Sequence, residues 1–236
     1  KKLKDESIEL CGEDFEEKFA DYTKTKYAVA CNSGTSALEL IFRSIDVEGK
    51  EVILPSNTFL ATAIAIMNAG GIPVFADCAD DMCLDIDDVI SKFNDKTCAV
   101  TIVHIGGLLS EKIFELKNFC EQKGIFLVED AAQAHGSSLK GTKAGAFGVA
   151  SGFSFFSTKV MTTGEGGIVT TNSKKFADKM KSMREFGKLP RGNITNYHEY
   201  FGYNWRMPEV SALMGIKQLE KLDEFKKRRQ EIAKRY

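Results

Sequence analysis

Three short segments of the sequence carry residue types suited to chemistry as well as to packing. The first, residues 32–36 (NSGTS), lies between an apolar run and an amphipathic one. Its glycine permits a tight turn, its hydroxyls can cap a helix, and free N–H groups at the helix start would bind an anion such as phosphate. An ordinary capped helix gives the same pattern. The segment lacks both the Walker lysine and the G-x-G-x-x-G spacing.

The second and third segments carry an acid and an amine. Residues 129–136 (EDAAQAHG) place Asp130 at the end of an apolar run, where a side chain can point into the ligand crevice of an α/β sheet. A helix N-cap is the alternative for this aspartate. Residues 153–167 place Lys159 among aromatic and hydroxyl side chains, before a Gly-rich turn. Desolvation lowers the pKa of a lysine and makes its amine nucleophilic; an exposed loop lysine is the alternative.

Together the three segments fit one cofactor. Pyridoxal phosphate needs donors for its phosphate, a carboxylate that keeps its ring nitrogen protonated, and a lysine that forms a Schiff base with its aldehyde. Each of the three segments falls at the end of an expected strand.

The elements that position these residues alternate along the chain. Apolar or β-branched runs predict strands at 27–31, 51–54, 73–77, 98–103, 125–129, 150–155 and 167–171. Amphipathic or small-residue stretches predict helices at 36–46, 60–69, 111–122, 174–185 and 208–230. Such alternation predicts an α/β fold of three layers, α/β/α, with a mostly parallel seven-stranded sheet. The stretch 186–205 is the longest irregular part and is rich in aromatic residues, which favours an interface.

Composition excludes several classes of protein. The 236 residues carry a net charge of −1, which gives no general hold on nucleic acid or an anionic membrane. The six cysteines form no C-x-x-C motif, and the three histidines have no metal-ligand spacing, so we expect no metal. His135 is expected to be a structural histidine, and His104 lies near the expected crevice without an assigned role. Reduced cysteines in apolar runs predict a cytoplasmic protein.

Five motifs occur in the order found in one enzyme family. They are NSGTSAL, PSNTFLATA, VEDAAQAHGS, FSFFSTKVMTTGEGGIV and GYNWRMPEVSALMG. The chain resembles the DegT/DnrJ/StrS family of pyridoxal-phosphate-dependent sugar aminotransferases over roughly residues 8–230. The resemblance implies the large domain of a fold-type-I enzyme. Residues 1–236 would form this cofactor-binding domain and end in the helix that leads to a small C-terminal domain.

The resemblance also implies roles for the residues around the cofactor ring. Lys159 would be the catalytic Schiff-base lysine and the acid and base of transamination. Asp130 would pair with the ring nitrogen, and Gln133 would reach the ring hydroxyl oxygen. Phe59 would stack on a face of the ring.

Four further residues would act on the phosphate. Thr35, Ser36 and Ser154 would hold it within one chain. Asn204, in GYNWRM, resembles the asparagine that crosses from a second subunit. The resemblance therefore implies a homodimer with shared active sites.

The expected reaction rests on the same resemblance. An amino acid, usually glutamate, would donate an amino group to a nucleotide-linked keto sugar, at carbon 4, in polysaccharide or lipopolysaccharide biosynthesis. One alternative is a member of the same family that aminates a cyclitol or makes an aromatic amine. Another is a truncated, non-catalytic scaffold or regulatory relative. The family's dehydratase branch has His where this chain has Lys159.

Overall fold

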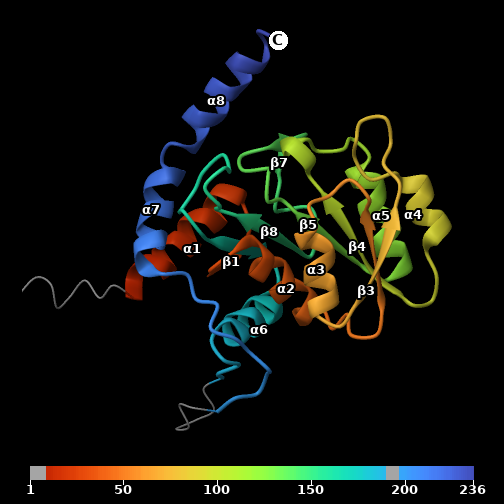
Figure 1. Ribbon diagram of the computed structural model, residues 1–236, viewed down its shortest axis with the longest axis horizontal. Helices are drawn as coiled ribbons and strands as arrows, with labels where there is room; N and C mark the ends of the chain where they lie inside the picture. The colour runs from red at the N-terminus through yellow and green to blue at the C-terminus, as the bar shows by residue number, and fades with distance from the viewer. Residues whose placement is uncertain (1–8, 190–196) are drawn as a thin grey trace, which may run out of the picture.

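The computed structural model describes residues 9–189 and 197–236, and its core is one sheet. The sheet has seven strands in the order β1-β9-β8-β5-β4-β2-β3 (Figure 1). Their bounds are β1 (Tyr27–Cys31), β2 (Glu51–Pro55), β3 (Ile72–Ala76), β4 (Thr97–Val103), β5 (Phe126–Asp130), β8 (Ala150–Ser154) and β9 (Gly167–Thr171). Strand β9 runs antiparallel to β1 and β8, and the other pairs are parallel. The mostly parallel seven-stranded sheet predicted from the sequence is confirmed.

Helices cover both faces of this sheet (Figure 1). Their bounds are α1 (Glu9–Thr23), α2 (Gly34–Ser44), α3 (Ala61–Asn68), α4 (Ile86–Lys92), α5 (Ile113–Lys123), α6 (Lys174–Arg184), α7 (Glu209–Leu219) and α8 (Leu222–Ala233). A short 3-10 turn, η2 (Ile105–Gly107), follows β4, and a two-stranded hairpin joins β6 (Ser138–Leu139) to β7 (Thr142–Lys143).

Two apolar cores lie on opposite faces of the sheet. One joins α1, α4, α5 and α7 to the sheet and includes Phe15, Val89 and Ile113. The other joins α2, α3 and α6 to the sheet and includes Leu38 and Ile66. These cores make the three layers of the predicted α/β/α architecture.

Three helical assignments differ from the sequence prediction. Helices α1 and α4 were not predicted, and the single helix expected at 208–230 is two helices. The break lies between Leu219 and Leu222, and Leu222 is fully buried. The residues at this break, Glu220 and Lys221, are good helix formers, so residue type alone does not predict it.

The aromatic stretch 186–205 is described at both of its ends, and residues 190–196 lie outside the described residues. Single bridges join Lys188 to His198 and Glu185 to Asn204, so its two arms lie side by side. The ring of Tyr203 stacks on that of Trp205, with centroids 4.0 Å apart. Phe201 is 76% exposed in the single chain, and the interface expected at this stretch stays a prediction.

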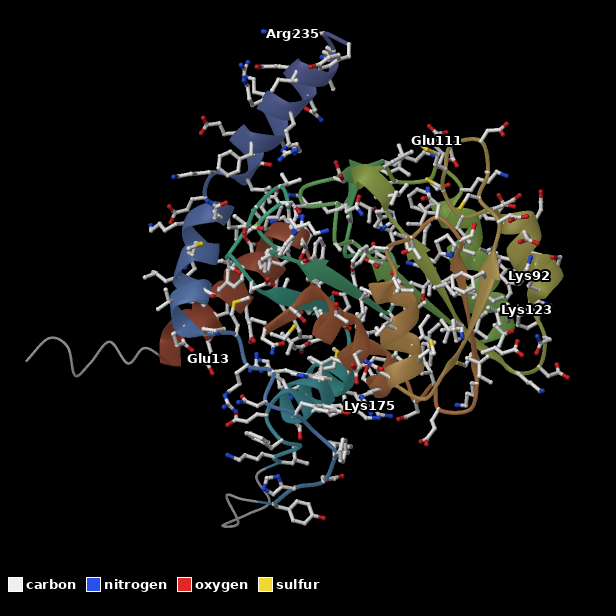
Figure 2. All side chains as sticks on the ribbon, in the orientation of Figure 1. Glu13, Lys92, Glu111, Lys123, Lys175 and Arg235 are labelled. Carbon is white, nitrogen blue, oxygen red and sulfur yellow. The ribbon has the colours of Figure 1, made fainter. Side chains whose placement is uncertain are left out.

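Charged side chains are spread over the surface in both signs. Figure 2 labels six that lie at the periphery, from Glu13 on α1 to Arg235 beyond α8. Within the described part of the chain, no helix is both long and apolar enough to cross a membrane.

Candidate active site

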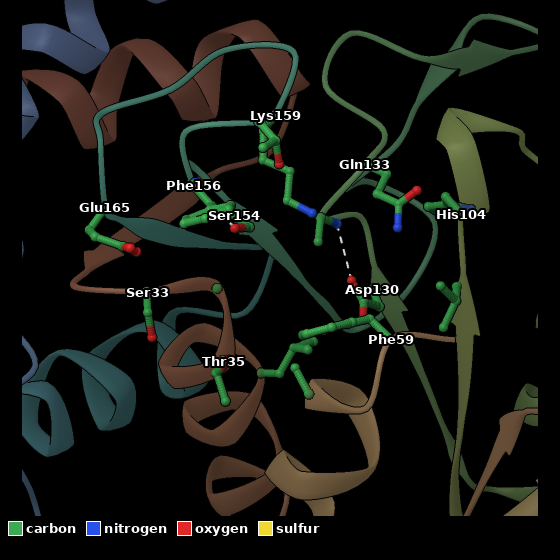
Figure 3. Close-up of a pocket in the computed structure, with 16 residues that line it drawn as sticks. Ser33, Thr35, Phe59, His104, Asp130, Gln133, Ser154, Phe156, Lys159 and Glu165 are labelled. Atoms are coloured by element: carbon green, nitrogen blue, oxygen red, sulfur yellow. Dashed lines mark hydrogen bonds between the residues drawn. The ribbon is translucent and has the colours of Figure 1, made fainter. Parts of the chain in front are cut away.

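A cavity of about 440 Å³ opens where β4, β5 and β8 end and where α2 and α3 begin. Six of the eight site residues predicted from the sequence line it: Thr35, Phe59, Asp130, Gln133, Ser154 and Lys159 (Figure 3). Ser36 and Asn204 do not line it. Segments distant in the sequence thus meet at the end of the sheet where α/β folds bind ligands.

Lys159 lies in a turn just beyond β8. Its main-chain N–H donates to the carbonyl of Phe156 at 3.0 Å, and its side chain is half-buried and extends into the cavity toward Asp130 (Figure 3). The following turn is held by hydroxyls: Thr162 Oγ1 donates to the Phe155 carbonyl at 2.9 Å, and Thr163 Oγ1 donates to that of Glu165 at 2.7 Å. These bonds fix the backbone that carries the amine.

Asp130 is the last residue of β5 and is 6% exposed. The N–H of Ala132 donates to Oδ1 at 3.1 Å, and Thr62 Oγ1 donates to Oδ2 at 2.7 Å. Burial raises the pKa of this carboxyl, while those two hydrogen bonds and the nearby His104 and Lys159 act in the opposite direction. Thr62 was not singled out from the sequence, and only its place beside Asp130 in the fold identifies it.

Glu129, next to Asp130, does not line the cavity, because successive strand residues face opposite sides. It is fully buried and accepts N–H groups from Gly145, Phe147 and Gly148, each at 2.8 Å. His104 Nε2 lies 3.0 Å from Glu129 Oε2. A carboxylate only accepts, so this ring nitrogen donates. Glu129 therefore fixes His104, which lines the cavity.

Gln133 is held by the turn after β4. The N–H of Gly106 donates to Gln133 Oε1 at 2.8 Å, which leaves the amide nitrogen on the cavity side (Figure 3). Gly106 has φ +60° and Gly107 has φ +85°, a region that favours glycine. A Cβ on Gly107 would also lie 3.0 Å from the Gln133 carbonyl oxygen. The glycine pair thus allows the close approach that orients Gln133.

The start of α2 forms the end of the cavity expected to hold phosphate. Ser33 is the N-cap and accepts the Ser36 N–H at 3.0 Å. The Ser36 hydroxyl donates to Asn32 Oδ1 at 2.8 Å, so it supports the turn and lies outside the cavity. A Cβ on Gly34 would lie 2.6 Å from Ser154 Cβ, so only glycine lets α2 begin against β8. Gly34 and Thr35 line the cavity.

Phe59 and Asn204 lie on the outside of this arrangement. Phe59 lines the cavity and is 75% exposed. Asn204 is exposed, and the adjacent Trp205 carbonyl accepts the N–H of Asn32 at 2.9 Å. Asn204 is thus adjacent to a residue that bonds the turn before α2, yet it does not line the cavity of its own chain. Its role toward a second subunit stays a prediction.

His135 is part of the core. It is 3% exposed, and its ring lies 5.5 Å from that of Phe153 and 5.6 Å from that of Phe155. Burial lowers its pKa to about 3, so the ring is neutral. Among the described residues, no group of three or more His, Cys, Asp or Glu side chains could hold a metal ion.

The chain matches the model of one known protein family over nearly its whole length. The model of the DegT/DnrJ/EryC1/StrS aminotransferase family matches residues 11–236. The chain belongs to this family. The resemblance stated from the five motifs is confirmed. The family is one of aminotransferases, which is an enzyme class that the cavity geometry alone does not identify.

Individual members of the family are similar over nearly the whole chain. GDP-perosamine synthase of Vibrio cholerae is 38% identical over 224 residues, which is 94% of this chain and 60% of that protein. L-glutamine:2-deoxy-scyllo-inosose aminotransferase of Streptomyces kanamyceticus is 35% identical, over 92% of this chain and 53% of that protein. The PLP-form of Spr1654 from Streptococcus pneumoniae superposes with a TM-score of 0.85 at 29% identity, covering 96% of this chain and 63% of that one.

This member of the DegT family has the fold-type-I architecture predicted for it. The chain spans about three fifths of the length of the first curated relatives that it matches.

Proposed function

We propose that the protein containing this chain is a pyridoxal-phosphate-dependent aminotransferase, and that residues 1–236 form its cofactor-binding domain. The observation that carries the proposal is the shared cavity of Lys159 and Asp130 in a chain of this family. The PLP-form of Spr1654, which has the same fold, supports the choice of cofactor.

The donor set fits the cofactor. Asp130 would hold the proton of the ring nitrogen, the Gln133 amide would donate to the ring hydroxyl oxygen, and Phe59 would cover one ring face. Thr35 and Ser154, with the N–H groups that begin α2, would hold the phosphate. Ala132 lines the cavity with a small side chain and leaves room for a flat group.

The residues divide the chemistry among them. When bound, the cofactor supplies an electron sink for the substrate carbon. Lys159 Nζ would move a proton between that substrate carbon and the cofactor in both halves of the reaction. Asp130 would keep the ring positively charged, and the turn bonds of Thr162 and Thr163 would hold Lys159 within reach.

We further propose that the substrates are an amino-acid donor, glutamate, and a nucleotide-linked keto sugar aminated at carbon 4. The similarity to GDP-perosamine synthase supports a nucleotide-linked sugar acceptor, and a role in polysaccharide or lipopolysaccharide synthesis accords with it. Five of the six cysteines, namely Cys31, Cys78, Cys83, Cys98 and Cys120, are free, which accords with the cytoplasm. Asn204 would complete the phosphate site of a second subunit in a homodimer.

A cyclitol acceptor is the second candidate, favoured by the similarity to L-glutamine:2-deoxy-scyllo-inosose aminotransferase. A panel of keto-sugar nucleotides and keto-cyclitols, each offered with glutamate or glutamine, separates the two. Turnover of a keto-cyclitol alone would replace the first candidate.

The test of the enzyme class is covalent trapping. Full-length protein loaded with pyridoxal phosphate is reduced with borohydride and mapped by peptide mass spectrometry. The label is expected on Lys159, and Lys159→Ala should remove it. A label on another lysine would overturn the role of Lys159. Absence of any bound cofactor would favour a non-catalytic relative.

A further inference from the structure

A buried hydroxyl lies behind the carboxylate of the site. Thr62, in the first turn of α3, is fully buried, and its Oγ1 is 2.7 Å from Asp130 Oδ2. Thr58 Oγ1 lies 2.7 Å from Thr62 Oγ1 and is only half-buried. The two hydroxyls form a chain from the protein surface to Asp130.

The direction of this chain depends on the charge of Asp130. An ionised carboxylate only accepts, so the single proton of Thr62 is donated to Oδ2. Thr62 Oγ1 then accepts from Thr58 Oγ1 at 2.7 Å, which is closer than the 3.3 Å from Thr58 Oγ1 to its other acceptor, the Phe59 carbonyl oxygen. Both hydrogen bonds can form with either protonation state of Asp130, but a hydroxyl that donates to an ionised carboxylate makes a stronger hydrogen bond than one paired with a neutral acid. The hydroxyl pair therefore favours the charged form of the acid.

Asp130 needs such donors because it is buried. Burial raises the pKa of its carboxyl. The groups that oppose this effect are the Thr62 hydroxyl, the Ala132 N–H, and the nearby His104 and Lys159. Lys159 would be consumed as the Schiff-base lysine when the cofactor is bound. Thr62 and Ala132 then contribute more to stabilising the ionised carboxylate of Asp130. Of these two, only Thr62 acts through its side chain.

We propose that Thr62 is a positioning residue that keeps Asp130 ionised and fixes its Oδ2, with Thr58 setting the direction of the Thr62 hydroxyl. The catalytic value of this device rests on the proposed function, in which Asp130 holds the proton of the cofactor's ring nitrogen. The hydrogen-bond chain itself is a property of the protein alone, and it can be tested without cofactor.

The experiment compares Thr62→Val with Thr62→Ser in the full-length protein. Valine keeps the shape and removes the hydroxyl, while serine restores it. Thr101→Val is the matched control, because Thr101 on β4 is also fully buried and its Oγ1 has no hydrogen-bond partner among the described residues. Thr58→Val removes the outer hydroxyl at a half-buried position, where loss of folding is not expected.

The first readout is the pKa of Asp130 in cofactor-free protein. The free energy of unfolding is measured against pH for each variant with and without Asp130→Asn, and the difference isolates this acid. Because the folded-state pKa of Asp130 is raised, the folded protein binds this proton more tightly than the unfolded chain does. The free energy of unfolding of the protein with Asp130 therefore falls, relative to that of Asp130→Asn, as pH rises from the unfolded-state pKa through the folded-state one. Loss of a hydrogen bond to a charged group should raise the upper limit of that window by about one to two pH units in Thr62→Val.

The other variants decide the interpretation. Thr62→Ser and Thr101→Val should leave the Asp130 midpoint where the wild type has it, and Thr58→Val should raise it by less than Thr62→Val. Equal midpoints in Thr62→Val, Thr58→Val and wild type would overturn the proposal. An upward shift in Thr101→Val as large as that in Thr62→Val would also overturn it.

The second readout uses pyridoxal phosphate. Thr62→Val should weaken cofactor binding about tenfold and lower kcat, with rescue by Thr62→Ser. A wild-type protein that binds no cofactor would refute the proposed function and leave the first readout intact. Normal cofactor binding and turnover in Thr62→Val would overturn the role of Thr62 as a positioning residue for Asp130.

Discussion

The main-chain N–H of Gly106 donates a hydrogen bond of 2.8 Å to Gln133 Oε1, and this contact decides which end of the amide faces the cavity. The amide oxygen is used by the protein, so the nitrogen is the end offered to a ligand (Figure 3). The site thus offers an amide donor that would suit the ring hydroxyl oxygen of the proposed cofactor. A donor fixed in advance costs less ordering when the ligand binds.

Gln133→Glu should weaken binding of pyridoxal phosphate at least tenfold. The carboxylate can still accept from Gly106, but it offers an acceptor and a negative charge to the ring oxygen. Titration followed by absorbance measures the affinity. Gln122→Glu makes the same change at an exposed position on α5 and should bind as the wild type does. Unchanged affinity in Gln133→Glu would remove Gln133 from the proposed site.

Asp130→Asn should lower kcat at least a hundredfold while the protein stays folded and still binds the cofactor phosphate. A neutral amide cannot hold the proton of the ring nitrogen, so the electron sink is lost. Steady-state kinetics measures the loss, and Asp21→Asn, at an exposed position on α1, is the control. Near-native turnover of Asp130→Asn would contradict the assignment.

Mixing two inactive variants should restore activity if Asn204 serves the partner's site. In a mixed dimer of Lys159→Ala and Asn204→Ala chains, one site carries both defects and the other carries neither. Up to about a quarter of wild-type activity is expected from random pairing of equal amounts, because half of the dimers have one intact site out of two. Native mass spectrometry confirms that mixed dimers form. Mixed dimers without activity would exclude the shared site.

The free energy of unfolding should fall as the pH is lowered, because His135 is buried as a neutral ring. The folded-state pKa is about 3, far below the ordinary value, so the folded protein keeps this ring neutral while the unfolded chain takes up a proton. Stability is unaffected above pH ~6.5 and falls by up to about 1.4 kcal/mol per pH unit from there toward pH 3. In His135→Leu this slope should be shallower, because the unfolded chain takes up one proton fewer over that pH range. Chemical denaturation at several pH values measures it.

The exposed His198 provides the control for that measurement. His198→Leu makes the same substitution at an exposed position outside the core. An identical slope in His135→Leu and wild type would show that His135 is charged in the folded protein.

The strands and the cavity residues were largely readable from the sequence. Every strand of the main sheet was predicted within two residues, because strands buried on both faces are apolar throughout. The direction of β9 was not predicted, since an apolar run has the same pattern in parallel and antiparallel pairing. The break before Leu222 was also missed, because the residue types on both sides of it are compatible with one continuous helix.

The cavity residues that could be predicted are those whose neighbours in the sequence form a recognisable motif. Lys159 and Asp130 come from such motifs, and the structure brings both into one cavity. Alternation along β5 explains why Asp130 faces the cavity and Glu129 does not. Thr62 was missed because its partner is distant in the sequence, and a threonine in a helix has no local pattern that reveals a buried hydrogen bond.

The position of β1 bears on how the protein folds during synthesis. Among the described strands its only neighbour in the sheet is β9, and the pairing joins Tyr27 to Thr171. Strand β1 is synthesised before β9, so it lacks this partner until β9 has emerged from the ribosome. Folding of this edge therefore depends on a contact between distant parts of the sequence, which slows it and leaves an unpaired strand exposed meanwhile. The residues that line the proposed cofactor site extend from Ser33 to Glu165, so a nascent chain could not complete this site before most of the domain has been synthesised.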